Sequence, residues 1–178
     1  MKSLLDIFKK LRTRRKNFKR VKIRKGILTV FIQFLRDRLG YVFNVEEEFD
    51  KRFLLQKYVF MARYFGLDMG YDYPLYIYGP YSGELEDDYY ELSSLETLPK
   101  TGLPSGFDAG GFIELVRGRD ARWLEVAASI LSVLEEYPSL SEDEVYGILR
   151  MSKPWLTRER FREVCEALVE RRLIGKLS

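Results

Sequence analysis

The sequence predicts a mainly helical protein: a helical domain with a small extended or β segment, followed by a winged-helix-like C-terminal lobe. Two observations support this fold class. Apolar residues recur at helical spacing in the stretches 27–39, 50–65, 122–137 and 157–172. The one stretch with strand-like character, 71–78, is short and rich in tyrosine. The 178 residues are enough for one domain, or for one domain with a small lobe.

Two helices are expected to form the core of the N-terminal part. Ile27–Leu39 has apolar side chains on one face, and Gly40 ends it. Asp50 has the side chain of an N-cap for a second helix, which runs to Phe65 and ends at Gly66. This second helix is apolar almost all round, and its clearest polar line is Arg52, Gln56 and Arg63. We therefore expect a central core helix that meets solvent along one narrow stripe.

A turn and an acidic helix are expected next. Pro74 restricts Tyr71–Tyr78 to an edge strand or an extended loop. Gly79-Pro80 predicts a turn, and Ser82 is the expected N-cap of the following helix. The first turns of that helix carry negative charge, as the helix dipole favours, on Glu84, Glu86, Asp87 and Asp88.

The second half of the chain begins with a loop, 97–111, which contains two prolines and four glycines and divides the chain into two lobes. Arg122–Tyr137 is then a predicted helix. Its polar side chains form one stripe: Glu125, Ser129, Ser132 and Glu136.

The tail is predicted to hold two helices and a short strand. Ser141 caps the helix Glu142–Arg150, Pro154 separates it from Thr157–Arg172, and Leu173–Leu177 returns as the strand. This order is the outline of half a winged helix. The predicted organisation is a basic arm (1–25), a helical core with the turn (26–96), a loop (97–111) and a winged-helix-like lobe (112–178).

The chain has no histidine and a single cysteine, Cys165. Without histidine, serine–histidine and cysteine–histidine catalysis is excluded. Cys165 lies on an apolar helical stripe, which favours a buried, unreactive thiol over a nucleophile. One cysteine also excludes an intramolecular disulfide and a multi-cysteine zinc site. We therefore expect a non-enzymatic protein and predict no catalytic residue, metal ligand or cofactor.

Positive charge is concentrated at the amino terminus. Residues 1–25 contain 12 Lys or Arg against one Asp, a formal charge of +11, whereas the remaining residues carry −8. Such a density of cations attracts phosphate backbones. The candidate polyanion-binding residues are Lys9, Lys10, Arg12, Arg14, Arg15, Lys16, Lys19 and Arg20.

Other interpretations of the arm stay open. In one interpretation, the arm docks on the acidic body of its own chain or of a second copy. In another, it is an extended start to a folded domain that begins near Gly26. Val21 and Ile23 alternate with basic residues in a strand-like rhythm. As a basic amphipathic helix, the arm is also suited to an anionic membrane surface, the least favoured of these.

Nothing in the sequence predicts a membrane-spanning or exported protein. No stretch approaches the ~20 apolar residues that cross a bilayer. The amino terminus has too short an apolar segment for a signal peptide and lacks a small-residue cleavage site. We therefore expect a cytoplasmic location.

Two segments of the body are candidate sites. Tyrosine hydroxyls and a tight turn offer a partner or ligand surface at Tyr76, Tyr78, Gly79, Pro80, Tyr81 and Ser82. The alternative is that this segment only makes the corner between an extended stretch and a helix. Carboxylates at helical spacing, Glu84, Asp87, Asp88 and Glu91, have the chemistry of a magnesium or manganese site, but dipole-matched surface charges are favoured over it.

The charge of the last predicted helix is relevant to whether the tail binds nucleic acid. Five arginines face four glutamates in Thr157–Arg172, a smaller positive excess than a recognition helix normally has. Lys153, Arg158 and Arg162 are a candidate patch at its start. A packing or dimerisation lobe is the favoured interpretation.

Three segments resemble a known family: Arg52-x-Leu54-Leu55-Gln56-Lys57-x-Val59-Phe60, then Tyr76-x-Tyr78-Gly79-Pro80-Tyr81-Ser82-x-x-Leu85, and finally Lys153-Pro154. Over residues 50–178 the chain resembles the YwgA-like family of prokaryotic proteins, and more distantly the Panacea antitoxin-type domains. The first resemblance implies no activity. The second implies a helical module that binds and restrains protein partners, although Tyr81 stands where Panacea domains usually have valine.

These observations favour a non-enzymatic binding or regulatory module that recognises a protein partner or a second copy of itself. The alternative is a nucleic-acid-binding transcriptional or antitoxin-like regulator that uses the basic arm. A metal-dependent enzyme built on the acidic helix is the weakest of the three hypotheses.

Overall fold

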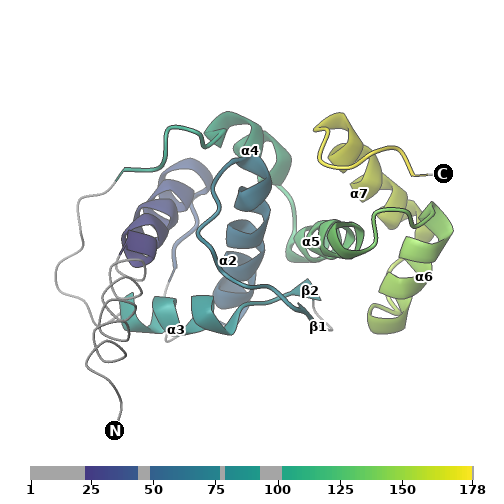
Figure 1. Ribbon diagram of the computed structural model, residues 1–178, viewed down its shortest axis with the longest axis horizontal. Helices are drawn as coiled ribbons and strands as arrows, with labels where there is room; N and C mark the ends of the chain where they lie inside the picture. The colour runs from purple at the N-terminus through teal and green to yellow at the C-terminus, as the bar shows by residue number, and fades with distance from the viewer. Residues whose placement is uncertain (1–22, 44–48, 77–78, 93–101, 178) are drawn as a thin grey trace, which may run out of the picture.

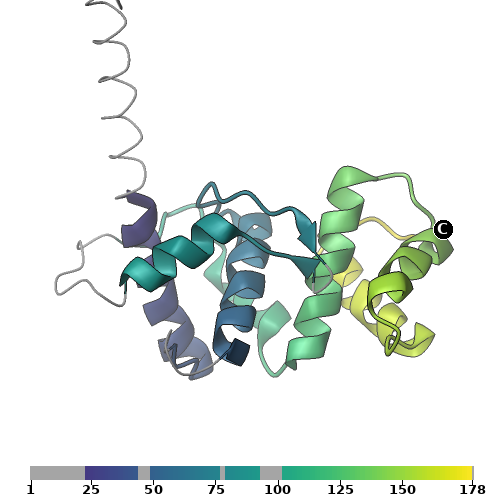
Figure 2. The same cartoon turned by 90° about the horizontal axis from the view of Figure 1, so that it is seen from below.

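The computed structural model describes residues 23–43, 49–76, 79–92 and 102–177. Over these residues the protein is mainly helical, with a small two-stranded antiparallel sheet, so the predicted helical class with a small β segment is confirmed. Helix α5 (Ala121–Glu136) lies in the middle of the molecule (Figures 1 and 2), between an N-terminal group of helices and the pair α6 (Glu142–Ser152) and α7 (Arg158–Glu170). No described helix has the length and apolar character needed to cross a membrane.

The first described helix covers residues 23–39 and packs Leu28, Phe31 and Leu35 into the core. It ends at Gly40, whose φ of +67° is the left-handed conformation of a helix C-terminus. The strand-like rhythm predicted around Ile23 is wrong at that residue, which is already helical. The next two residues, Arg24 and Lys25, contact α3 (Gly83–Leu92).

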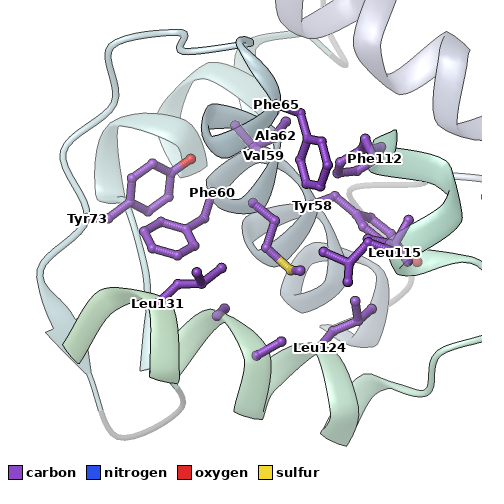
Figure 3. Packing of buried hydrophobic residues seen from close by; sticks show 14 of the residues in the cluster. Tyr58, Val59, Phe60, Ala62, Phe65, Tyr73, Phe112, Leu115, Leu124 and Leu131 are labelled. Carbon is purple, nitrogen blue, oxygen red and sulfur yellow. The ribbon is translucent and has the colours of Figure 1, made fainter. Parts of the chain in front are cut away.

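Helix α2 (Phe49–Ala62) is the central helix of the N-terminal part, and a 3₁₀ turn, η1 (Arg63–Phe65), extends it to Gly66. Asp50 lies inside its first turn rather than at the N-cap. Every side chain from Leu55 to Ala62 is buried, so the predicted solvent stripe is wrong at Gln56, whereas Arg52 and Arg63 are partly exposed. Figure 3 shows aromatic and aliphatic side chains from α4 (Ala109–Val116), α5 and the tyrosine-rich segment packed around the apolar side chains of this helix.

The predicted turn is present. Strand β1 (Leu75–Tyr76) pairs antiparallel with β2 (Gly79–Pro80), in the register Leu75↔Pro80 and Tyr76↔Gly79. Ser82 then caps α3 (Gly83–Leu92), because its Oγ accepts a hydrogen bond from Leu85 N at 3.3 Å. The N-cap prediction is confirmed.

The predicted loop 97–111 ends earlier than expected, at Asp108, because Ala109–Gly111 form the first turn of α4 (Ala109–Val116). Asp108 is the N-cap, and its side chain accepts from Gly111 N at 2.9 Å. A Cβ on Gly111 would lie 2.3 Å from Asp108 Oδ2, so the glycine leaves room for the capping carboxylate.

Helix α5 (Ala121–Glu136) is capped by Asp120, which accepts from Trp123 N at 2.7 Å. The polar stripe predicted for this helix is wrong at Glu125 and Ser129, which are both buried. Strand β2 packs on α5 and α2 packs beside it, so that face is internal.

The tail contains α6 (Glu142–Ser152), which starts with a capping box between Ser141 and Glu144, and α7 (Arg158–Glu170), which Thr157 caps. Residues 173–177 form no strand, so the predicted strand is wrong. The winged-helix likeness of this part stays a prediction. Buried residues from the first described helix through α7 belong to one hydrophobic cluster, which crosses the 97–111 segment.

Candidate functional site

The eight candidate polyanion-binding residues of the arm, Lys9 to Arg20, lie outside the described residues. The described end of the arm binds the acidic helix α3. Arg24 Nε lies 2.7 Å from Asp88 Oδ2, and Lys25 Nζ lies 3.7 Å from Asp88 Oδ1. Tyr71 also donates to Asp88 Oδ2, at 2.9 Å. The last two cations of the arm therefore dock on the acidic body of their own chain, as one of the predicted alternatives requires.

The acidic face of α3 is thus occupied by cations. Besides the buried Asp88, Glu84 pairs with Arg24 at 3.1 Å, and Glu91 pairs with Lys25. No group of three or more Asp, Glu, His or Cys side chains suited to a metal ion occurs among the described residues. These contacts favour a structural role for the acidic cluster.

The Gly79-Pro80 turn is held by two adjacent side chains of α2. Gln56 Nε2 donates to Ser82 O at 2.9 Å, and Ser82 N donates back to Gln56 Oε1 at 2.9 Å. Lys57 Nζ donates to Pro80 O at 2.8 Å. Backbone groups of a turn buried against other elements must find such partners, because an unpaired buried group is costly. Gln56 and Lys57, each 1% exposed, supply them.

Gly79 allows the turn to approach α5. Its φ is +84°, and a Cβ there would lie 2.7 Å from Ser129 Oγ, 3.5 Å from Glu125 O and 3.6 Å from Lys57 Nζ. Ser129 Oγ itself donates to Glu125 O at 2.8 Å, which fixes its position. Only glycine fits this backbone conformation at this separation without displacing its neighbours.

Behind the turn lie three buried charged residues. Lys153 Nζ contacts Glu125 Oε1 at 3.1 Å, which joins the C-cap of α6 to the middle of α5. Burial lowers the pKa of Lys57 to about 7, against the opposing effect of the Glu125 carboxylate, and the Lys153 charge lowers it further. We call Lys57, Glu125 and Lys153 the buried charge cluster.

A pocket of about 470 Å³ opens beside the turn, between α2, the turn and α3. Lys57 and Gly79 are buried in its floor, and Phe49 and Tyr90, which are 68% and 44% exposed, stand at its rim. The lining residues are Phe49, Arg52, Phe53, Lys57, Gly79, Tyr81, Glu86, Tyr89 and Tyr90. We call this the aromatic pocket.

Polar contacts order the pocket wall. The Arg52 guanidinium lies 6.0 Å from the Phe49 ring centroid, and Lys57 Nζ lies 4.7 Å from that of Phe53. Glu86 accepts from Tyr89 at 3.5 Å. Burial and then a hydrogen bond to Glu86 raise the pKa of Tyr81, so both tyrosine hydroxyls stay protonated beside this carboxylate.

No protein-family model, curated protein or solved structure matches this chain. The resemblance to YwgA-like and Panacea proteins therefore stays a prediction. The structure does bring the quoted segments together: Gln56-Lys57, the Gly79–Ser82 turn and Lys153 meet around one buried polar network.

Of the predicted partner surface, Gly79 and Tyr81 line the pocket, whereas Pro80 and Ser82 are buried and bind α2. The structure describes the backbone of Tyr76, in β1, and Tyr78 lies outside the described residues. Sequence reasoning missed the other aromatic residues of the pocket as site residues. Their signal was weak, since each lies in a helix where an aromatic residue normally indicates core.

The predicted cationic patch at the start of α7 is wrong. Lys153 is buried on Glu125, and both Arg158 and Arg162 pair with Glu142, at 3.6 and 2.9 Å. Cys165 is buried as predicted, and burial together with nearby glutamates raises the pKa of its thiol to about 12. These contacts favour a structural role for the tail.

Proposed function

We propose that this chain is a non-enzymatic binding module that recognises a segment of a partner protein in the aromatic pocket. The observation that carries the proposal is the exposure of Phe49 and Tyr90 at the rim of a concave site whose floor is fixed. Clustered exposed aromatic residues are energetically unfavourable in water and commonly mark a protein-binding surface.

The floor supports this proposal because it is pre-organised. Gln56 and Lys57 hold the turn by three hydrogen bonds, and Gly79 seats it on α5. A partner that docks on such a floor does not have to order it, so less of the interaction energy is lost on binding. Tyrosine, phenylalanine and arginine side chains around the floor are the residue types enriched in interface hot spots.

The test is selection of a displayed library of random peptides on the full-length chain. Peptides that insert an apolar side chain in the pocket should bind wild type and lose at least about tenfold in affinity for the Phe49→Ala and Tyr90→Ala variants. Tyr137→Ala and Met151→Ala are matched controls, because Tyr137 and Met151 are 54% and 82% exposed elsewhere. Equal binding by all four variants, or no selected peptide, would reject the proposal.

A second function rests on the charge of +11 in residues 1–25, which favours contact with nucleic acid. Deletion of residues 1–22 retains Arg24 and Lys25, whose ion pairs on α3 belong to the fold. We expect the full chain to bind generic DNA or RNA with a steep salt dependence, and the deletion variant to lose this binding. Absence of binding by the full chain at about 50 mM salt would exclude this function.

A further inference from the structure

Lys57 places a primary amine in the floor of the aromatic pocket. Its Nζ lies 4.7 Å from the centroid of the Phe53 ring, and a Cβ on Gly79 would lie 3.6 Å from it. Phe53 and Gly79 both line the pocket, as Lys57 itself does. Because Lys57 is 1% exposed, the pocket is the route by which a small molecule reaches its amine.

The surroundings of this amine favour its neutral form. Its hydrogen-bond acceptor, Pro80 O, is an uncharged carbonyl oxygen 2.8 Å away. Burial lowers the pKa of Lys57 to about 7; the Glu125 carboxylate opposes this effect, and the Lys153 charge adds to it. At pH 7 about half of the Lys57 side chains are therefore neutral amines, against about 0.03% for a lysine with the ordinary pKa of 10.5.

The charged groups on the pocket side are Arg52, on α2, and Glu86, on α3. Glu86 accepts hydrogen bonds from Tyr89 and Tyr81, so its carboxylate has partners of its own. The pKa of Lys57 is shifted by burial and by the two charges behind the turn. The protonation state of the amine is thus set from the interior of the protein.

We propose that Lys57 is a covalent binding site for apolar aldehydes, whose apolar part is held by the aromatic walls of the pocket. The lone pair of the neutral amine forms a bond to the carbonyl carbon. The aldehyde oxygen then leaves as water with both amine hydrogens, and a carbon–nitrogen double bond remains. Lysines that are desolvated or lie next to another cation are nucleophiles of this kind.

The backbone of the turn is placed to stabilise the product. Protonation of the imine returns one N–H to the nitrogen, and this N–H donates to Pro80 O in place of the ammonium group. The inference goes beyond the proposed function, because it concerns a small molecule and requires no partner protein.

The test is reductive trapping on the full-length chain at pH 7.0. Benzaldehyde is the probe, and cyanoborohydride adds hydride to the imine carbon, which makes the adduct permanent. Peptide mass spectrometry gives the extent of modification at each lysine. We expect Lys57 to react at least about tenfold faster than Lys176, which is exposed, and to lose this preference in urea. Equal or slower reaction at Lys57, or a preference that persists in the unfolded chain, would overturn the inference.

A second aldehyde tests the role of the aromatic walls. Glycolaldehyde has no apolar group to bury, so its preference for Lys57 over Lys176 should be smaller than that of benzaldehyde by about threefold or more. An equal preference would show that the pocket does not select apolar aldehydes, and this part of the proposal would be withdrawn.

The pH dependence tests the state of the amine. Between pH 7 and 8.5 the neutral fraction of Lys57 rises about twofold, whereas that of a lysine with the ordinary pKa rises about 30-fold. The ratio of the two benzaldehyde rates, Lys57 over Lys176, should therefore fall by about tenfold or more, and the reagent's own pH dependence cancels in it. A constant ratio would contradict the inference. Failure of any of these measurements leaves the proposed function standing, because peptide selection does not depend on the reactivity of the amine.

Discussion

Lys57 Nζ donates a hydrogen bond to the carbonyl oxygen of Pro80 at 2.8 Å, and this contact joins the central helix to the turn that forms the floor of the pocket. The neighbouring residue, Gln56, binds Ser82 on the same turn. Consecutive residues of a helix point about 100° apart, so both reach the turn because it packs directly against this side of α2. The floor of the pocket depends on these contacts between α2 and the turn, and each contact can be tested separately.

Gln56→Leu tests the paired hydrogen bonds. The substitution leaves Ser82 N and O buried without these partners, and we expect the free energy of unfolding to fall by about 2–4 kcal/mol in urea denaturation. Gln33→Leu is the matched control, because Gln33 is exposed and binds only Asp37 in the part of the chain described. It should change stability by less than about 0.5 kcal/mol. Similar effects of both substitutions would contradict the role given to Gln56.

Gly79→Ala tests the approach of the turn to α5. The new Cβ would lie 2.7 Å from Ser129 Oγ on a backbone with φ of +84°, so we expect strain and steric overlap to cost about 2–4 kcal/mol. Gly118→Ala separates the two causes, since Gly118 has φ of +73° and open space around its Cβ position. It should cost only about 1 kcal/mol.

A double variant completes that test. Because Ser129 Oγ is the atom that a Gly79 side chain would meet first, Ser129→Ala should recover part of the stability lost in Gly79→Ala. Purely additive losses of unfolding free energy would show that the serine hydroxyl is not what excludes a side chain at this position.

Helices with one apolar face and a capping residue could be predicted from sequence. Ser82 and Ser141 were identified as N-caps because hydroxyl side chains favour that position for local reasons. Gly40 and Gly66 were identified as helix ends for the same kind of reason. The direction of polar side chains is not predictable in this way: helical periodicity places Gln56 and Glu125 on polar stripes, whereas both are buried.

That failure has a physical cause. Periodicity shows that polar residues share a face, but not whether water or another part of the chain covers it. At Gln56 and Glu125 the cover is provided by the Gly79-Pro80 turn and by Lys153, which are distant in sequence. Apart from Tyr81, the aromatic residues of the pocket could not be predicted as site residues, because they come from α2 and α3 and meet only in the folded chain.

The pH dependence of stability tests the burial of Lys57. In the unfolded chain Lys57 stays protonated up to its ordinary pKa of 10.5, whereas burial in the folded chain lowers the pKa to about 7. The unfolded state therefore binds more protons above pH 7, and the free energy of unfolding should rise with pH in this range. Between pH 7 and 8.5 the contribution is on the order of 1–2 kcal/mol.

The measurement is a comparison of wild type with Lys57→Met by urea denaturation at pH 7 and 8.5. The substitution should remove the rise, while ionisable groups common to both proteins cancel in the difference. The upper limit of pH 8.5 keeps the experiment below the ordinary pKa of cysteine and tyrosine, because burial raises the pKa of Cys165 and of several tyrosines and opposes the effect at higher pH. A rise of equal size in both proteins would contradict the assignment to Lys57.

The buried ion pair of Glu125 and Lys153 gives the last prediction. Glu125→Gln leaves two buried lysines without their carboxylate, so we expect a loss of about 3–5 kcal/mol in the free energy of unfolding. Removal of both partners, in Glu125→Leu with Lys153→Met, should cost less than either single change, because no unpaired charge remains at this ion pair. Glu114→Gln, which breaks the exposed pair with Arg171, should cost less than about 1 kcal/mol. If the double variant loses the sum of the single effects, Glu125 and Lys153 are not energetically coupled.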